Sequence, residues 1–218
     1  KVVNSTSKYI NANSSAISGV ITDGGKFKWD TEKYPGMKDF KKFGPFAYTA
    51  KLRNGLFRNT GACLSPQNAF YNSIGMETLG LRMERVCDNA KTLAQFFATE
   101  YSDIEVNYPG LAGSKWHNIA TEQFGDKFGG IITIRTGNKK RAFGIIDALK
   151  LPLIVSNIGD TKTLVIHPES TLNVHSTQEE KETAGVFDDL IRISVGIEDI
   201  DDLIDDFKQA IESVKDVY

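Results

Sequence analysis

The stretch Asn4-Ser5-Thr6-Ser7-Lys8-Tyr9-Ile10-Asn11 lies near the start of the sequence and surrounds one lysine with hydroxyl residues. A lysine amine that is desolvated, or that lies near another cation, loses its proton more easily and can attack a carbonyl to form a Schiff base. Ser5 and Ser7 are two residues apart, so in an extended segment their hydroxyls point the same way. They could then hold a phosphate while Lys8 reaches the carbonyl of the same ligand. The alternative is a surface turn rich in Ser and Asn, which short motifs of this kind more often mark.

The composition is typical of an ordinary globular protein. Of the 218 residues, 40% are hydrophobic and 25% are charged, and the formal net charge is -2. This balance gives no electrostatic reason to expect a nucleic-acid partner or a membrane partner. No apolar run approaches the ~20 residues of a spanning helix, and the first residues do not have the pattern of a signal peptide.

The cysteines and histidines carry no recognisable motif. Cys63 and Cys87 are far apart in the sequence, which favours two reduced cysteines in a cytoplasmic protein. His117, His167 and His175 have no metal-ligand spacing, so we expect no metal site.

The first residue is not methionine, and a strand-like segment follows it at once. We therefore expect this chain to be the C-terminal half of a longer enzyme.

Residues 1–100 contain a strand, an aromatic-rich region and a long helical pattern. A strand is expected over residues 16–22, and a loop region with a short helix near 46–54 is expected within 26–60. Ser65-Pro66 is a typical helix start, and Gly75 and Gly80 predict a kink or two helices within 61–100. The apolar stripe of that pattern is Leu79, Met83, Val86, Ala90, Leu93 and Phe97.

The rest of the chain alternates short strands and helices. We expect strands over residues 104–108, 129–136, 151–156, 163–166 and 190–196, and helices over 117–124, 139–149, 176–184 and 199–217. The buried stripe expected for the last helix is Ile200, Leu203, Ile204, Phe207, Ile211 and Val214. This alternation indicates a layered α/β or α+β domain of about 140 residues.

The lysine stretch resembles that of the Cys/Met-metabolism enzymes, in which Ser-x-Ser/Thr-Lys-Tyr supplies a Schiff-base lysine and two hydroxyls for the phosphate of pyridoxal 5'-phosphate. The resemblance continues through Gly61-x-x-Leu64-Ser65-Pro66 and Leu81-Arg82-Met83-Glu84-Arg85 to the last helix. It implies an α/β fold, the C-terminal part of a fold-type I (aspartate aminotransferase-like) enzyme. Residues 1–76 would end the large cofactor domain, and 77–218 would form the small domain with its linking helix. Lys8 would be the catalytic residue, and Ser5, Ser7 and Lys8 would bind the cofactor.

Arg192 lies in the middle of a predicted strand. A guanidinium there either faces solvent or needs a partner such as a carboxylate, which it binds in a planar two-bond fork. Arg192-Ile193-Ser194-Val195-Gly196-Ile197-Glu198 is similar to the substrate-carboxylate motif of the family. By the same resemblance, Ser156 and the backbone at Asn157 would help to hold that carboxylate, and Thr171 would lie near the substrate.

The sequence also departs from the family pattern. Asn11-Ala12-Asn13 stands where many members have Asn-Gly-His, and the residues that the family uses upstream of its lysine are absent from this sequence. The family also implies a Tyr and an Arg supplied to the phosphate by a neighbouring subunit.

The resemblance implies γ-replacement on O-acetylhomoserine, in which sulfide or a thiol displaces acetate to give homocysteine or methionine. The segment 23–29, Asp-Gly-Gly-Lys-Phe-Lys-Trp, is similar to an insertion of the sulfhydrylase branch. A γ-lyase or cystathionine γ-synthase of the same family is one alternative. The other is a catalytically incomplete domain that acts only in subunit association. The implied partners are an amino-acid substrate, further copies of the chain (a tetramer in the family) and a separate chain carrying the N-terminal half.

Overall fold

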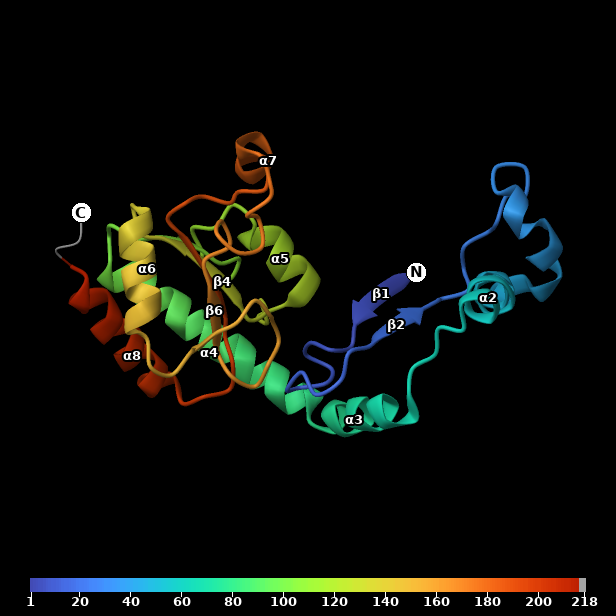
Figure 1. Cartoon of the computed structure of the whole chain (residues 1–218), viewed down its shortest axis with the longest axis horizontal. Coiled ribbons are helices and arrows are strands. Elements are labelled where there is room, and N and C mark those ends of the chain that lie inside the picture. The colour runs from blue at the N-terminus through green and yellow to red at the C-terminus, as the bar shows by residue number, and fades with distance from the viewer. Residues whose placement is uncertain (216–218) are drawn as a thin grey trace.

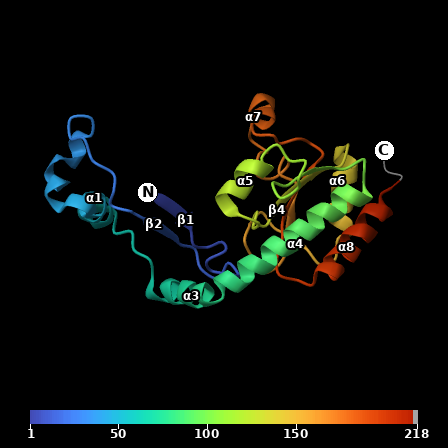
Figure 2. The same cartoon turned by 180° about the vertical axis from the view of Figure 1, so that it is seen from behind.

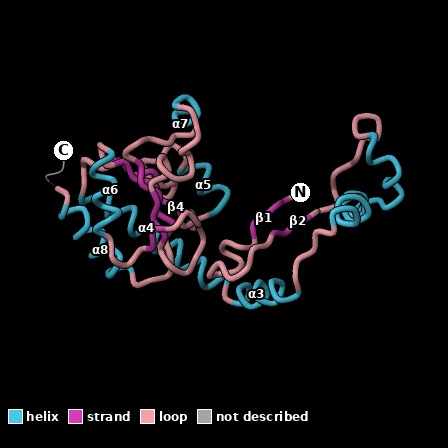
Figure 3. Tube along the Cα trace, viewed as in Figure 1, coloured by secondary structure: helices cyan, strands magenta, loops and turns pink. Residues whose placement is uncertain are grey.

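The computed structural model describes residues 1–215, which form a globular body and a projecting arm (Figure 1). We define the arm as residues 1–78 and the body as residues 79–215. The arm extends away from the body in both ribbon views, and its last helix, α3 (Pro66–Glu77), leads into the long helix α4 (Leu79–Glu100) (Figure 2). The strands lie in two places, a hairpin in the arm and a larger sheet in the body (Figure 3).

The arm begins with two short antiparallel strands, β1 (Val2–Ser5) and β2 (Gly19–Thr22). The region that follows is more helical than the sequence predicts. A 3-10 helix, η1 (Pro35–Phe46), runs into α1 (Ala47–Leu52), a π-helical turn η2 (Arg53–Phe57) and α2 (Arg58–Thr60). Pro35 is suited to a first helical position, and the left-handed Gly44 (φ 53°) makes the kink before Pro45. The prediction of a loop with one short helix was therefore wrong in extent.

The predicted pair of helices is confirmed. Helix α3 (Pro66–Glu77) begins at Ser65, whose hydroxyl accepts a hydrogen bond from the Asn68 amide at 3.2 Å. Helix α4 (Leu79–Glu100) follows after Thr78. Inside α3, a Cβ on Gly75 would lie only 2.4 Å from the main-chain oxygen of Ile10. Gly75 lets α3 approach the lysine stretch closely.

The body contains a five-stranded sheet in the order β3-β4-β7-β6-β5. Its strands are β3 (Glu105–Asn107), β4 (Ile131–Arg135), β5 (Leu153–Ile154), β6 (Leu164–Ile166) and β7 (Leu190–Ser194). Only β5 and β6 pair in parallel. All lie where the sequence predicts strands, but β5 is much shorter than predicted.

Helices α4, α6 (Lys139–Ala148) and α8 (Ile200–Ser213) pack together against the sheet. Helices α5 (His117–Phe124) and α7 (Gln178–Thr183) lie on the other side, away from α6 and α8 (Figure 1). Helix α7 opens with a capping box between Thr177 and Glu180. The last helix ends at Ser213, earlier than predicted, and the predicted residues 216 and 217 lie outside the described residues.

The core lies between the sheet and this helical layer. Ile132 and Ile134 of β4 and Ile191 and Ile193 of β7 point into it and are fully buried. Phe97 and Phe207 meet edge to face, with ring centroids 5.2 Å apart. The most deeply buried members of the two predicted stripes are Val86, Ala90, Leu93 and Phe97 on α4 and Leu203, Phe207 and Ile211 on α8.

Residues 1–215 contain no helix that is both long and apolar enough to cross a membrane. Within the same range, His, Cys, Asp and Glu side chains nowhere gather in a group of three suited to a metal ion. Cys63 is exposed, Cys87 is buried, and both are free thiols.

Candidate active site

The lysine stretch forms a turn and is not extended. Strand β1 ends at Ser5, and Thr6–Ile10 turn so that the Asn11 amide donates to the Lys8 oxygen at 3.1 Å. The expectation that Ser5 and Ser7 share one extended segment was therefore wrong. Ser5 is exposed at the strand end, while the half-buried Ser7 hydroxyl accepts from the Ser18 amide at 2.8 Å. A phosphate-binding role for both hydroxyls stays a prediction.

A buried polar network attaches this turn to α3. The Thr6 hydroxyl donates to the Ser18 hydroxyl at 2.5 Å. Nδ2 of Asn72, on α3, donates to the same Ser18 hydroxyl at 2.8 Å, and Oδ1 of Asn72 accepts from the side-chain Nδ2 of Asn11 at 3.3 Å. Buried polar groups need such partners, since leaving them unpaired costs free energy. The network therefore gives the lysine turn a defined position on α3.

Arg82 of α4 makes a second attachment. Its guanidinium donates to the main-chain oxygens of Tyr9, at 2.7 Å, and Gly75, at 2.6 Å, and to the Thr78 hydroxyl at 3.1 Å. Burial lowers the pKa of Arg82 from its ordinary value. Arg82 thus ties the lysine turn to the corner between α3 and α4. Arg82 occurs in a stretch that resembles the family, but this contact could not be predicted from the residues around it.

Tyr9 packs the turn onto the body. A Cβ on Gly159 would lie 2.8 Å from the Tyr9 nitrogen and 3.0 Å from its ring, so only glycine allows this approach. The Ser194 hydroxyl accepts from the Gly159 amide at 3.0 Å. Burial raises the pKa of the Tyr9 phenol, and a hydrogen bond with Ser194 partly offsets that effect. Tyr9, the residue next to Lys8, is therefore held against β7 and its neighbouring loop.

Lys8 and Arg192 both hydrogen-bond to one residue, Asn157, Lys8 to its side chain and Arg192 to its main chain. The Lys8 amine donates to the Asn157 side-chain oxygen, and Nη2 of Arg192 donates to the Asn157 main-chain oxygen at 3.1 Å. Lys8 and Asn157 are 149 positions apart in the sequence, so this meeting is purely tertiary.

Arg192 lies on the sheet face turned away from the core, opposite Thr133 of β4 and Ile166 of β6. Its side chain is nevertheless half-buried, and burial lowers the pKa of the guanidinium. The Arg192 Nε is buried and has no hydrogen-bond partner within residues 1–215. The buried, unpaired Nε lies next to Nη2, which already donates to Asn157. A ligand with two acceptor oxygens, such as a carboxylate, suits a guanidinium with a donor free on this side.

Within residues 1–215, the other two predicted substrate residues form no hydrogen bond with Lys8 or Arg192. Ser156 is exposed, next to Asn157 in the chain. Thr171 is exposed and its hydroxyl donates to the His167 main-chain oxygen at 2.7 Å. Its loop starts beside Arg192, because Ile166 pairs with Arg192 in the sheet. Substrate contacts for both residues stay predictions.

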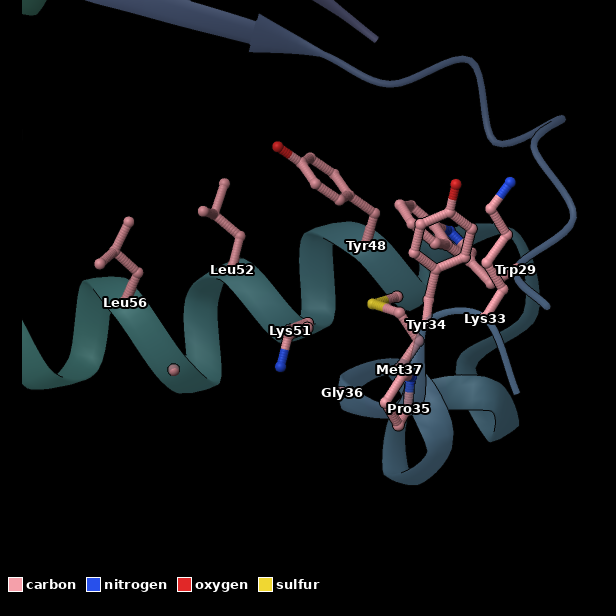
Figure 4. Close-up of a pocket in the computed structure, with 11 residues that line it drawn as sticks. Trp29, Lys33, Tyr34, Pro35, Gly36, Met37, Tyr48, Lys51, Leu52 and Leu56 are labelled. Carbon is pink, nitrogen blue, oxygen red and sulfur yellow. The ribbon is translucent and has the colours of Figure 1, made fainter. Parts of the chain in front are cut away.

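The aromatic-rich part of the arm lines an open pocket of about 500 Å³, separate from the lysine turn (Figure 4). Trp29, Tyr34 and Tyr48 line it together, with the Trp29 and Tyr48 rings stacked 5.9 Å apart, and Leu52 and Leu56 continue its wall along the helical segment. The Lys1 ammonium lies 4.9 Å from the Tyr48 ring centroid. The mixture of lysines and aromatics in this segment thus makes cation–π contacts within the arm.

The Lys8 amine and the Arg192 guanidinium both bond to Asn157. Such a pair can bind a molecule with a carbonyl at one end and a carboxylate at the other. The fold and this pair define a chain of the α/β class with a lysine-centred site. The model of the Cys/Met metabolism PLP-dependent enzyme family matches residues 2–212. This chain belongs to that family.

Its relatives carry consistent names. The chain is 38% identical to the O-acetyl-L-homoserine sulfhydrylase of Corynebacterium glutamicum, over 98% of this chain and 52% of the relative. It is also 38% identical to the homocysteine synthase of Schizosaccharomyces pombe, over 97% of this chain and 52% of the relative. The chain therefore spans about half the length of the curated relatives it matches.

A solved structure from Campylobacter jejuni, described as an O-acetylhomoserine (thiol)-lyase with N'-pyridoxyl-lysine-5'-monophosphate, has the same fold. The TM-score is 0.87 at 34% identity, covering 96% of this chain and 53% of the other. Pyridoxal phosphate is thus the cofactor of the family, and a neighbour of this fold carries it on a lysine.

Proposed function

We propose that this chain contributes to a pyridoxal-phosphate enzyme that replaces the acetyl group of O-acetylhomoserine by sulfide or a thiol. The observation that carries the proposal is the convergence of Lys8 and Arg192 on the two oxygens of Asn157. The named relatives support the substrate class.

The residues present fit the cofactor and an amino-acid substrate. Lys8 offers a half-buried amine, and Ser5 and Ser7 offer nearby hydroxyls for a phosphate. The unpartnered Nε of Arg192 offers a donor for a carboxylate. When bound, the cofactor ring supplies an electron sink for bonds at the substrate α carbon.

Lys8 would hold the cofactor until the substrate amine displaces it. The released amine would then take and return protons at the α and β carbons of the substrate. The bond from the γ carbon to oxygen breaks and acetate leaves with the electron pair. A new bond from the γ carbon to sulfur forms.

Arg192 would bind the substrate carboxylate through Nε and an Nη nitrogen, as a planar fork. Ser156, the Asn157 backbone and Thr171 would complete that end. Holding the carboxylate fixes the orientation of the α carbon, which makes the chemical step effectively intramolecular.

We also propose how the chain is divided and accompanied. Residues 1–76 would belong to the cofactor domain and 77–218 to the small domain. In support, the main apolar cluster within residues 1–215 draws its buried members from Ala90 onward.

The exposed apolar side chains of the arm support assembly with further copies or with a chain carrying the N-terminal half. The free thiols of Cys63 and Cys87 suit the reducing cytoplasm.

Replacing Lys8 by Ala tests the proposal. In the assembled enzyme, Lys8→Ala should lower the rate of homocysteine formation by at least about 1,000-fold, since the proton-transfer group is lost. Borohydride reduction of the unmodified enzyme should leave cofactor mass on the peptide containing Lys8. Lys140→Ala is the matched control, because Lys140 is an exposed lysine of α6 and its loss should leave both results unchanged.

Near-normal activity of Lys8→Ala, or cofactor mass on another lysine, would end the proposal. Product analysis separates the two related activities. Homocysteine from acetylhomoserine plus sulfide supports the sulfhydrylase, while breakdown of methionine or cystathionine alone would indicate a lyase.

A further inference from the structure

We infer that Asn157, Ser14 and Asp160 form a directed hydrogen-bond relay that positions the Lys8 amine. The inference rests on the proposed function and adds residues that act through Lys8. The Lys8 amine donates to Oδ1 of Asn157. Nδ2 of Asn157 donates to the Ser14 hydroxyl at 2.7 Å, and that hydroxyl donates to Oδ2 of Asp160 at 3.2 Å.

The direction of this relay follows from the groups at its ends. An ionised carboxylate can only accept a hydrogen bond, and a lysine ammonium can only donate. Ser14 must then turn its proton toward Asp160 and present a lone pair to Asn157. This fixes the Asn157 amide with its nitrogen toward Ser14 and its oxygen toward Lys8. Without Ser14 the amide could turn over and place an N–H group against the amine.

Asp160 is itself fixed. Its second oxygen, Oδ1, accepts from the Lys162 amide at 3.1 Å and from the Thr161 hydroxyl at 3.3 Å. Oδ2 therefore stays directed at Ser14.

The loop that presents Ser14 is held in an unusual backbone conformation. Ala12 and Ser14 both have left-handed φ angles, 80° and 58°, which cost free energy in residues other than glycine. The Thr161 amide donates to the Ala12 oxygen at 2.8 Å and ties this loop to the 157–161 segment. Strained non-glycine residues persist only where their surroundings hold them. Here the bond from Thr161 to Ala12 holds the loop in the conformation that presents Ser14 to Asn157.

The relay leaves the carboxylate end of the site untouched. Arg192 uses the main-chain oxygen of Asn157, which any residue at that position supplies. Changes to the Asn157 side chain or to Ser14 should therefore affect kcat, while KM for the amino-acid substrate should stay near its original value.

The test compares Ser14→Ala, Ser14→Gly and Ser15→Ala in the assembled enzyme. Ser15 is the neighbouring exposed serine, and its hydroxyl bonds only to Asn13 among the described residues. Both Ser14 variants should lower kcat about 5–10-fold with KM within about twofold, while Ser15→Ala should change neither. Ser14→Gly also relieves the left-handed backbone, so it separates loss of the hydroxyl from loss of strain.

A second readout needs no bound cofactor. In the cofactor-free enzyme, labelling of Lys8 by acetic anhydride at fixed pH, followed by peptide mass, should be about fivefold faster in both Ser14 variants. In an Asn157→Ala background, Ser14→Ala should add nothing further, because its effect passes through Asn157.

Three results would overturn the inference. These are unchanged Lys8 labelling and kcat in Ser14→Ala, full activity of Ser14→Gly, or an undiminished Ser14→Ala effect in the Asn157→Ala background. Lys8→Ala serves as the reference in the same assay. If it is inactive while the Ser14 variants behave as the original enzyme, the relay fails and the proposed function stands. If Lys8→Ala is active, the proposed function fails first.

Discussion

The body buries its large apolar side chains, whereas the arm exposes many of them. Phe97 and Phe207 of the body are fully buried, whereas Phe46 of the arm is 72% exposed and Ile17 is 88% exposed. The whole chain exposes 13315 Å². A compact monomer of this size exposes about 10,000 Å². The body has a core of its own, and the arm does not.

This difference shows what holds the candidate site together. The lysine turn belongs to the arm, yet Arg82 and Asn157 of the body hold it by hydrogen bonds, and Asn72 of α3 adds another from within the arm. Its position depends on few polar contacts, each individually modest in free energy, and not on a deep apolar core. We therefore expect changes in the body to affect folding, and changes at the turn to affect the site first.

The largest expected effect lies in the body. Phe97→Ala should lower the free energy of unfolding by about 3–5 kcal/mol, because it removes a fully buried ring and leaves a cavity. Phe46→Ala in the arm is the matched control and should cost less than about 0.5 kcal/mol. Urea unfolding of both variants measures the difference. A cost for Phe46→Ala close to that of Phe97→Ala would show that the arm is covered in solution.

The next effect concerns a contact within the arm, between α3 and the lysine turn. Gly75→Ala would place a Cβ 2.4 Å from the Ile10 oxygen and 2.7 Å from the Asn11 oxygen. The turn must then shift, so we expect a loss of about 1–3 kcal/mol and displacement of Lys8. Gly80→Ala meets nothing within 4 Å at the start of α4 and should stabilise the chain by roughly 0.5 kcal/mol.

Opposite signs for these two glycine variants in urea unfolding are the result to look for. A stabilising Gly75→Ala would mean that α3 does not touch the lysine turn. Faster Lys8 labelling in Gly75→Ala alone would confirm that the contact positions the turn.

The body was predictable from the sequence because its signals are local. The stripe from Val86 to Phe97 follows helical spacing, and α5 has the predicted bounds of residues 117–124. Arg192 was correctly placed on a strand between buried isoleucines. Periodicity records which side of an element faces the core, and the body has one core to face.

The site was only partly predictable because its contacts are not local. Lys8 and Arg192 could be found as motifs, but Ser14 and Asp160 are 146 positions apart in the sequence. The left-handed backbone at Ala12 and Ser14 leaves no mark in residue type, since neither is glycine. A turn rich in Ser and Asn was one of the two interpretations of the lysine stretch, but the partner of Ser7 was not predictable, because Ser18 lies 11 positions away, just before β2.

The smallest expected effect concerns the loop that contains Glu169, which ion pairs attach to neighbouring parts of the body. Glu169 lies in the loop with Thr171 and accepts hydrogen bonds from Lys181, at 2.5 Å, and Lys139, at 2.9 Å. These contacts with Lys181 and Lys139 lower the pKa of Glu169 from 4.5 to about 2. A carboxylate with a lowered folded pKa stabilises the fold above its unfolded pKa and loses that effect as pH falls.

Stability should therefore fall between about pH 4.5 and about pH 2, and Glu169→Gln should remove that part of the dependence while lowering stability at neutral pH. Urea unfolding across this pH range measures it, with the exposed Glu122→Gln as control. Added salt should weaken the effect only in part, because the Glu169 side chain is just 18% exposed. An unchanged acid profile in Glu169→Gln would mean that the Thr171 loop is held by its own turn at His167, and that charge contributes nothing to the substrate end of the site.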